Sequence, residues 1–158
     1  MATLDRADLL MLAVLQNEGR ITNAELATRV NLSASACLRR LQRLEADGVI
    51  TGYAARVDAR AVGLNLQVFV RVQLSSHEAA AIEHFVAQVN GWDEVTACHA
   101  LSGDMDYLLH VHVADLEAFS RFLLDRLLSA AGVADVNSSF VLRTVKRSPA
   151  LPLLAAGA

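Results

Sequence analysis

The spacing of the hydrophobic residues changes along this chain, and the change limits the folds that are open to it. Between residues 5 and 47, apolar residues recur at helical spacing. From residue 66 onward, apolar and polar residues alternate, which is the period of a strand with one buried face. The first alternating set is Val68, Val70, Val72 and Leu74. The sequence therefore predicts an α+β protein, with a helical part first and a sheet-containing part second.

The helical part carries signals for three short helices. Asp5 can cap a helix over residues 5–17. Residues 21–30 have the apolar spacing of about two helical turns. Ser33 can cap a third helix that runs to about Asp47. After it, the segment VITGYAARV at 49–57 predicts a strand, a glycine turn and a strand, and three helices followed by such a hairpin make a winged helix-turn-helix.

The second part alternates strands and helices in the order βαββαβ, which is the ferredoxin-like arrangement. We expect strands over 66–74, 94–101, 106–113 and 135–146, and helices over 78–90 and 115–130. The predicted domains are a winged helix-turn-helix over 1–60, a ferredoxin-like domain for ligand sensing and oligomerisation over 61–147, and a C-terminal tail over 148–158.

The charges are distributed unevenly, although the whole chain has a net charge of only −3. Residues 1–60 contain eight arginines and seven acidic residues, whereas residues 61–158 contain six basic and ten acidic residues. The positive charge is therefore concentrated in the helical part, as expected of a part that contacts nucleic acid. The longest apolar run, Leu9–Leu15, is far shorter than the roughly 20 residues of a membrane span, and we find no secretion signal. We expect a cytoplasmic protein that does not bind membranes.

Residues that could bind metal or catalyse a reaction do not form a familiar constellation. Cys37 and Cys98 lie far apart, and we interpret them as small hydrophobic residues. His110 and His112 share one face of a strand, but a structural zinc site needs four ligands at recognisable spacing. We find no glycine-rich phosphate loop, nucleophile elbow or HExxH motif. The sequence predicts no metal, no cofactor and no catalysis.

The third helix is the candidate for reading DNA. Its first turn is small and hydroxyl-rich, which lets a helix end approach base edges, and its arginines lie on or beside the face opposite its leucines. A solvated charged face on an ordinary three-helix domain would show the same charges. The predicted DNA-binding residues are Ser33, Ala34, Ser35, Arg39, Arg40 and Arg43 of this helix, with Arg20 and Arg56 as further backbone contacts.

Several motifs together resemble the Lrp/AsnC (feast/famine) regulators over about residues 3 to 147. They are Leu4-Asp5-x-x-Asp8, Gly19-Arg20-Ile21, Glu25-Leu26-Ala27, Asn31-Leu32-Ser33, Arg43-Leu44-Glu45, Gly48-Val49-Ile50-Thr51-Gly52-Tyr53, the segment Cys98–Leu109 (CHALSGDMDYLL) and Gly132-Val133. The segment Cys98–Leu109 is similar to the ligand loop of the leucine-responsive branch of that family. The resemblance implies that the protein binds double-stranded DNA, that it regulates amino-acid metabolism, and that a small molecule controls it. It also implies homodimers whose sheets pack face to face and which assemble into octamers.

The same resemblance places an effector loop at the turn between the two middle strands, at an interface between dimers. A free amino acid offers a carboxylate, an ammonium group and a side chain, so its site needs donors, an acceptor and an apolar wall. Serines and the Gly103 backbone can bind the carboxylate, aspartates the ammonium, and Leu101 and Phe140 the side chain. The predicted effector residues are Leu101, Ser102, Gly103, Asp104, Asp106, Ser138, Ser139 and Phe140. Ser-Gly-Asp is also ordinary hairpin chemistry, and residues alone leave that alternative open.

The sequence and its resemblance thus predict a homo-oligomeric, sequence-specific transcription regulator whose DNA affinity or assembly responds to a small effector, expected to be an amino acid. Two alternatives belong to other classes. One is an enzyme, since a few proteins that resemble this family are tetrapyrrole decarboxylases. The other is a metabolite-binding oligomer that does not bind DNA.

Overall fold

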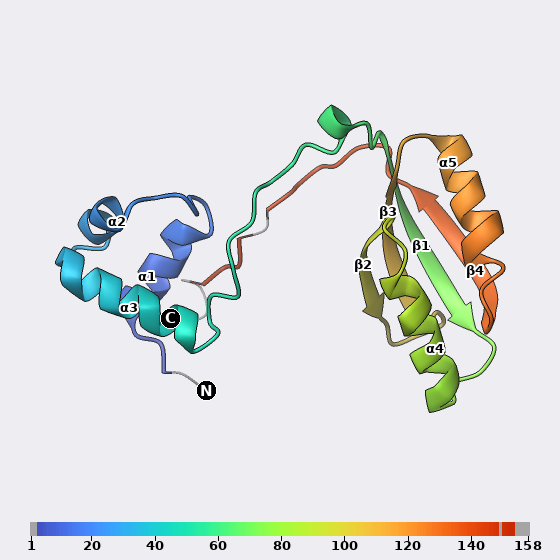
Figure 1. The fold of residues 1–158 in the computed structure, drawn as a ribbon, viewed down its shortest axis with the longest axis horizontal. Coiled ribbons are helices and arrows are strands. Elements are labelled where there is room, and N and C mark those ends of the chain that lie inside the picture. The colour runs from blue at the N-terminus through green and yellow to red at the C-terminus, as the bar shows by residue number, and fades with distance from the viewer. Residues whose placement is uncertain (1–2, 149, 154–158) are drawn as a thin grey trace. The chain divides into compact units, whose positions relative to one another are not determined.

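The computed structural model describes residues 3–148 and 150–153, and the chain divides into two compact units (Figure 1). The first unit comprises Met1–Arg56 and Val145–Ala158, and the second comprises Val57–Thr144. The chain therefore returns to the first unit after it has completed the second. The domain bounds predicted from the sequence differ here, since they place 145–147 in the second domain and 148–158 in a separate tail.

The first unit contains the three predicted helices. They are α1 over Arg6–Leu15, α2 over Asn23–Arg29 and α3 over Ala34–Ala46. Asp5 and Thr22 each accept a hydrogen bond from the backbone three residues on, and the acidic residue at that position bonds back to the cap. These reciprocal capping boxes, with Ser33 capping α3, explain why the helices start where the sequence predicts.

The core of the first unit is small and apolar. Its buried members are Met11, Leu26, Ala27, Val30 and Cys37. Burial also raises the pKa of the Cys37 thiol, as expected of a core residue. Two hydrogen bonds join the returning C-terminal segment to Gln16 of this unit. The side-chain oxygen of Gln16 accepts from the backbone N–H of Leu151 at 2.6 Å, and its side-chain nitrogen donates to the carbonyl of Leu151 at 3.3 Å.

The predicted hairpin over 49–57 is wrong in its detail. No strand forms there within the described residues. The backbone N–H groups of Val49 and Ile50 both donate to the carbonyl of Leu44, at 2.9 and 3.1 Å, and so they complete the end of α3 instead of starting a ladder. An isolated two-stranded hairpin is at best marginally stable in water, so this local hydrogen bonding prevails.

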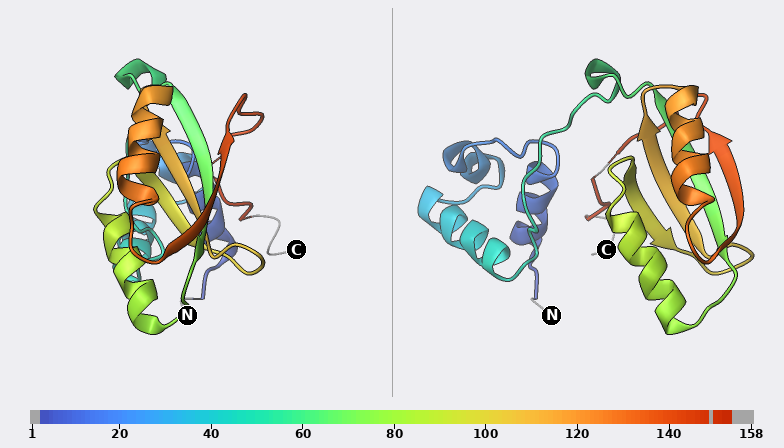
Figure 2. Two further views of the ribbon diagram at one scale, coloured as in Figure 1. Left: turned by 90° about the vertical axis from the view of Figure 1, so that its right-hand side faces the viewer. Right: turned by 45° about the vertical axis from the view of Figure 1, so that its right-hand side comes forward.

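The second unit has the predicted βαββαβ order. Its elements are β1 (Leu66–Leu74), α4 (Ala79–Asn90), β2 (Val95–Ala100), β3 (Tyr107–Val113), α5 (Leu116–Arg121), the π-helical turn η2 (Phe122–Leu127) and β4 (Val133–Phe140). The strands form one antiparallel sheet in the order β2-β3-β1-β4, and both helices cover the same face of it (Figure 2, left). The last strand is shorter than the predicted 135–146 and ends at Phe140.

The period-two pattern of β1 separates the two faces of this sheet. Its valines and Leu74 are buried under the helices, where they pack with Phe85 and Phe119. Phe69 and Arg71 lie on the opposite, open face. There Phe69 stacks on His110, with ring centroids 4.6 Å apart, and the guanidinium of Arg71 donates to the side chain of Asn137 at 2.8 Å. The open face is therefore ordered and mixed in polarity.

The second helix of this unit changes its winding near its end. The backbone N–H of Leu128 donates to the carbonyl of Leu123, five residues back, at 2.9 Å. The sequence predicts one continuous helix over 115–130, and its apolar spacing contains no signal for this wider turn. Within the described residues, no helix is both long enough and apolar enough to cross a membrane.

Candidate DNA interface and effector turn

The N-terminus of α3 is exposed and held in place by its neighbours. The hydroxyl of Ser33 accepts a hydrogen bond from the backbone N–H of Ala36 at 3.3 Å, and it also lies 3.3 Å from the hydroxyl of Ser35. The side-chain amide of Asn23, in α2, donates to the carbonyl of Ala34 at 2.9 Å. Ser33, Ala34 and Ser35 are all solvent-exposed. A fixed, exposed helix N-terminus with small side chains is a ready site for a phosphate or a base edge.

The predicted arginines of the first unit differ in what they contact. Arg39 and Arg20 are exposed and make no hydrogen bond or ion pair with the residues that the structure describes. Arg56 is exposed and donates to the backbone carbonyl of Gln16 at 3.0 Å. Arg39 is thus the arginine of α3 that is free to meet a ligand outside the chain.

Arg40 and Arg43, by contrast, bind a carboxylate of their own chain. Asp8 of α1 is completely buried, and its two oxygens accept from Arg40 at 2.8 Å and from Arg43 at 2.5 Å. Arg40 also donates to Asp5 at 2.6 Å. The pKa of Asp5 is lowered, first by the hydrogen bond from the backbone N–H of Asp8 and then by the one from Arg40. From the sequence, Asp5 is expected only to cap α1, and no ion pair of Asp8 with α3 is predicted, because contacts between distant helices leave no local signal.

The predicted effector turn closes the hairpin of β2 and β3. The N–H of Leu101 donates to the carbonyl of Asp106 at 2.8 Å, and the N–H of Asp106 donates to the carbonyl of Val72 at 2.9 Å. Residues 101–104 are exposed. Gly103 has a φ of +125°, a conformation that side chains disfavour. The turn therefore presents backbone and side chains to solvent on a firmly hydrogen-bonded base.

The two aspartates of this turn have different roles. The carboxylate of Asp106 accepts from the backbone N–H of Leu74 and from the imidazole of His77, each at 2.7 Å. These two hydrogen bonds hold the pKa of Asp106 below its ordinary value, and the bond from Leu74 has the larger effect. Asp104 is exposed and has no hydrogen-bond partner among the described residues. Sequence reasoning missed His77, since nothing in its spacing connects the loop before α4 to the turn.

The remaining predicted effector residues do not join the turn within one chain. Phe140 pairs with Val68 of β1, whereas β3, the strand that leaves the turn, begins opposite Val72. Val68 and Val72 are four residues apart, which places Phe140 about 13 Å along the strand direction from the base of the turn, at roughly 3.3 Å per residue. Phe140 also packs edge-on against Phe119 of α5, with ring centroids 5.3 Å apart. Ser139 pairs with Phe69 on the open face, so it lies on the opposite face from Ser138 and Phe140.

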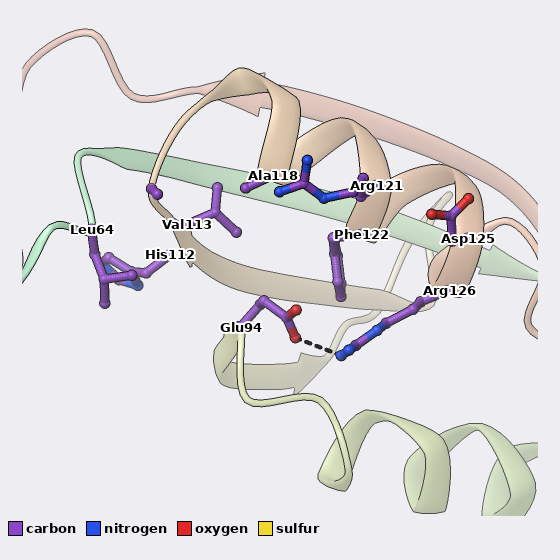
Figure 3. A pocket seen from close by; sticks show the side chains of 10 residues that line it. Leu64, Glu94, His112, Val113, Ala118, Arg121, Phe122, Asp125 and Arg126 are labelled. Atoms are coloured by element: carbon purple, nitrogen blue, oxygen red, sulfur yellow. Dashed lines mark hydrogen bonds and ion pairs between the residues drawn. The ribbon is translucent and has the colours of Figure 1, made fainter.

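A pocket of about 370 Å³ lies elsewhere in the second unit, beside α5 and η2 (Figure 3). Arg126 of η2 donates to the carboxylate of Glu94 at 2.9 Å at one side of it. Its apolar lining includes Leu64, Val113 and Phe122. None of the predicted effector residues lines this pocket. Among the described residues, no group of three or more possible ligands could hold a metal ion.

Comparisons with protein families match both units. Residues 4–51 match a family model described as a winged helix-turn-helix DNA-binding domain. Residues 67–151 match one described as an Lrp/AsnC ligand binding domain. The leucine-responsive regulatory protein of Escherichia coli K12 is 41% identical over 145 residues, which are 92% of this chain and 88% of that protein.

Two solved structures extend the likeness to three dimensions. A transcriptional regulator of Neisseria meningitidis, solved in complex with L-methionine, is 49% identical, with a TM-score of 0.94 over 98% of this chain and 99% of that one. A feast or famine regulatory protein of Mycobacterium tuberculosis, also complexed with L-methionine, is 34% identical, with a TM-score of 0.81 over 93% and 97%.

Proposed function

Because this chain belongs to the Lrp/AsnC family of transcription regulators, and is a DNA-binding regulator rather than an enzyme, we propose how its two units divide the work. The first unit reads DNA through the N-terminus of α3. The second unit binds an amino acid at the turn over 101–106 and joins copies of the chain. The observation that carries this division is that one unit has an exposed, capped helix N-terminus at α3, and the other has an exposed turn whose two ends are fixed by backbone hydrogen bonds.

On the DNA side, we propose that backbone N–H groups and hydroxyls of Ser33–Ser35 contact a phosphate or base edge. Arg39 follows one helical turn later, and its uncommitted guanidinium can bind a phosphate or guanine. Arg20 and Arg56 supply contacts to the DNA backbone. Arg40 and Arg43 are held by Asp8, so their predicted contact with DNA requires either that they bridge Asp8 and a phosphate or that they leave Asp8.

On the effector side, we propose an amino acid with a long apolar side chain, with methionine first and leucine second. Support comes from the methionine complexes of the two solved relatives and from the leucine-responsive relative. Ser102 and the backbone around Gly103 would bind the carboxylate. Asp104 is the carboxylate that is free to pair with the ammonium, since Asp106 is already satisfied by Leu74 and His77.

We further propose that a second copy of the chain completes this site. Phe140 of β4 lies about 13 Å along β1 from the base of the turn, and Ser139 lies on the other face of the sheet from Phe140, so β4 and the turn of one chain do not form a single complete site. A neighbouring copy can supply Ser139 or an equivalent donor instead. Homodimers would form through the open face around Phe69, and dimers would assemble further, with the octamer as the expected form.

The decisive experiment is calorimetric titration of the full chain with each protein amino acid, followed by DNA binding with and without the amino acid that binds. We expect methionine to bind and to change the affinity for a DNA site selected by the protein from random duplexes. Binding of no amino acid would remove the sensing role. Failure to bind any duplex at low salt would leave a metabolite-binding oligomer.

A further inference from the structure

The reading helix carries three arginines, and the chain's own carboxylates hold two of them. Asp8 lies in the first turn of α1 and is completely buried. Besides Arg40 and Arg43, it accepts a hydrogen bond from the backbone N–H of Asp5 at 3.1 Å. Arg39, next in sequence to Arg40, has no such partner among the described residues.

A buried carboxylate holds a guanidinium far more firmly than an exposed one. Asp8 is shielded from solvent while Arg40 and Arg43 are partly exposed, so water and salt screen their attraction less than they screen a pair in which both partners are exposed. Removing either arginine would leave negative charge buried with fewer donors, which is costly. A DNA phosphate must compete with this arrangement, whereas it can bind Arg39 without any such competition.

The same contact is not needed merely to join the two helices. Apolar side chains, among them Met11 of α1 and Cys37 of α3, already form the core beside it. An apolar pair of similar volume commonly holds elements together as well as a buried ion pair does, since no charge then has to be desolvated. The specific effect of Asp8 is that it holds the guanidinium groups of Arg40 and Arg43 on its own carboxylate, although the Arg43 side chain remains about half exposed.

We propose that Asp8 is a specificity-determining residue: it withholds Arg40 and Arg43 from DNA phosphates and so limits binding to DNA of any sequence. It is a positioning residue that does not touch DNA. Non-specific affinity comes almost entirely from phosphate contacts, each of which steepens the dependence of log K on log salt by about 0.9. Asp8 therefore restricts the sequence-independent part of binding and leaves discrimination to Arg39 and the N-terminus of α3. This inference rests on the proposed reading role of α3.

The test is Asp8→Asn in the full chain, with a 30-base-pair duplex of random sequence as the probe. Asparagine keeps the shape of the side chain and loses the charge. We expect the salt slope of non-specific binding to steepen by up to about 2, and the non-specific affinity at low salt to rise at least tenfold. The preference for a DNA site selected by the wild type should fall. The triple variant Asp8→Asn, Arg40→Gln and Arg43→Gln lacks both released arginines. Its salt slope should therefore return to the wild-type value.

Two further variants keep the outcome clear if Asp8→Asn does not fold. Asp5→Ser keeps the helix cap, is at an exposed position and releases one partner of Arg40, so the slope should steepen by less than about 1. Glu117→Gln removes the same charge and releases Arg121 in the other unit, and it should leave the slope unchanged. A purely structural Asp8 would weaken binding to every duplex without a steeper slope, and that result would overturn the inference. No binding by the wild type at low salt would instead refute the proposed function itself.

Discussion

The imidazole of His77 lies 2.7 Å from the carboxylate of Asp106, and the contact joins the loop before α4 to the base of the turn over 101–106. Asp106 also fixes the end of β1 through the N–H of Leu74. The turn thus depends on a residue that the sequence places in a different loop.

Replacing His77 should therefore weaken effector binding indirectly. In His77→Ala, the carboxylate of Asp106 loses one of its two donors and keeps only the backbone N–H of Leu74, so it can rotate and the turn is less well fixed. We expect a three- to tenfold loss of methionine affinity, with DNA binding unchanged, by calorimetry and anisotropy. His77→Gln, whose amide can donate to the same carboxylate, should recover most of the affinity. Equal affinities in the wild type and His77→Ala would show that the contact does not support the site.

The lowered pKa of Asp106 predicts how stability depends on acid. Its folded pKa lies below the ordinary value of 3.8, so the ionised form stabilises the folded chain above that value. This contribution is lost as the pH falls through the lowered, folded pKa. We expect the melting temperature of the wild type to fall more steeply below about pH 4 than that of Asp106→Asn. Parallel curves over this range would contradict the prediction.

Gly103 should be required for its backbone conformation and not for lack of space. Its φ is +125°, and no atom lies within 4 Å of where a Cβ would stand. Gly103→Ala should therefore strain the turn by about 1–3 kcal/mol and reduce methionine affinity at least tenfold, while DNA binding persists. Gly63→Ala, at a φ of +83° far along the chain from the turn, is the matched control and should keep normal affinity. An unaffected Gly103→Ala would place the effector elsewhere.

The arginines of α3 should separate into two classes. Arg39→Ala should reduce the salt slope of DNA binding by about 0.9 and leave thermal stability unchanged. Arg43→Ala should leave the slope nearly unchanged and cost roughly 1–3 kcal/mol in the free energy of unfolding, because Asp8 loses a donor inside the protein. Anisotropy against salt and urea denaturation measure the two effects. The same slope in both variants would contradict this division.

The open face of the sheet should be where copies of the chain meet. Phe69 is partly exposed there, and a charge at its position would face the neighbouring sheet. We expect Phe69→Glu to shift the protein to smaller species in light scattering. Leu124→Glu, at an exposed leucine on η2, should leave the assembly unchanged. A Phe69→Glu variant of wild-type size would exclude this face as the dimer interface.

The sequence predicted those elements whose signals are local. The predicted caps Asp5 and Ser33 determined the starts of α1 and α3, and the alternation in β1 determined which face is buried. The absent hairpin near Val49 depends on where two N–H groups find an acceptor, which the sequence pattern does not reveal.

The candidate site could be predicted less completely than the fold. The turn itself is visible as a motif, but the contact between His77 and Asp106 joins residues that are distant in sequence. The direction of an arginine side chain depends on its acceptor, so the helical pattern alone could not distinguish Arg39 from Arg43.

The π-helical turn η2 has a consequence for how this chain can change in length. Such a turn holds one more residue than an α-helix of the same span, and the helix on either side keeps its direction. Loss of one residue within 122–127 would convert the turn to ordinary α-helix and leave Phe119 and β4 in place. Phe122, Asp125 and Arg126 of this turn line the neighbouring pocket, so loss of one of them would change the pocket wall while the fold survived. This turn is therefore a place where a natural deletion could remodel the neighbouring pocket without unfolding the domain.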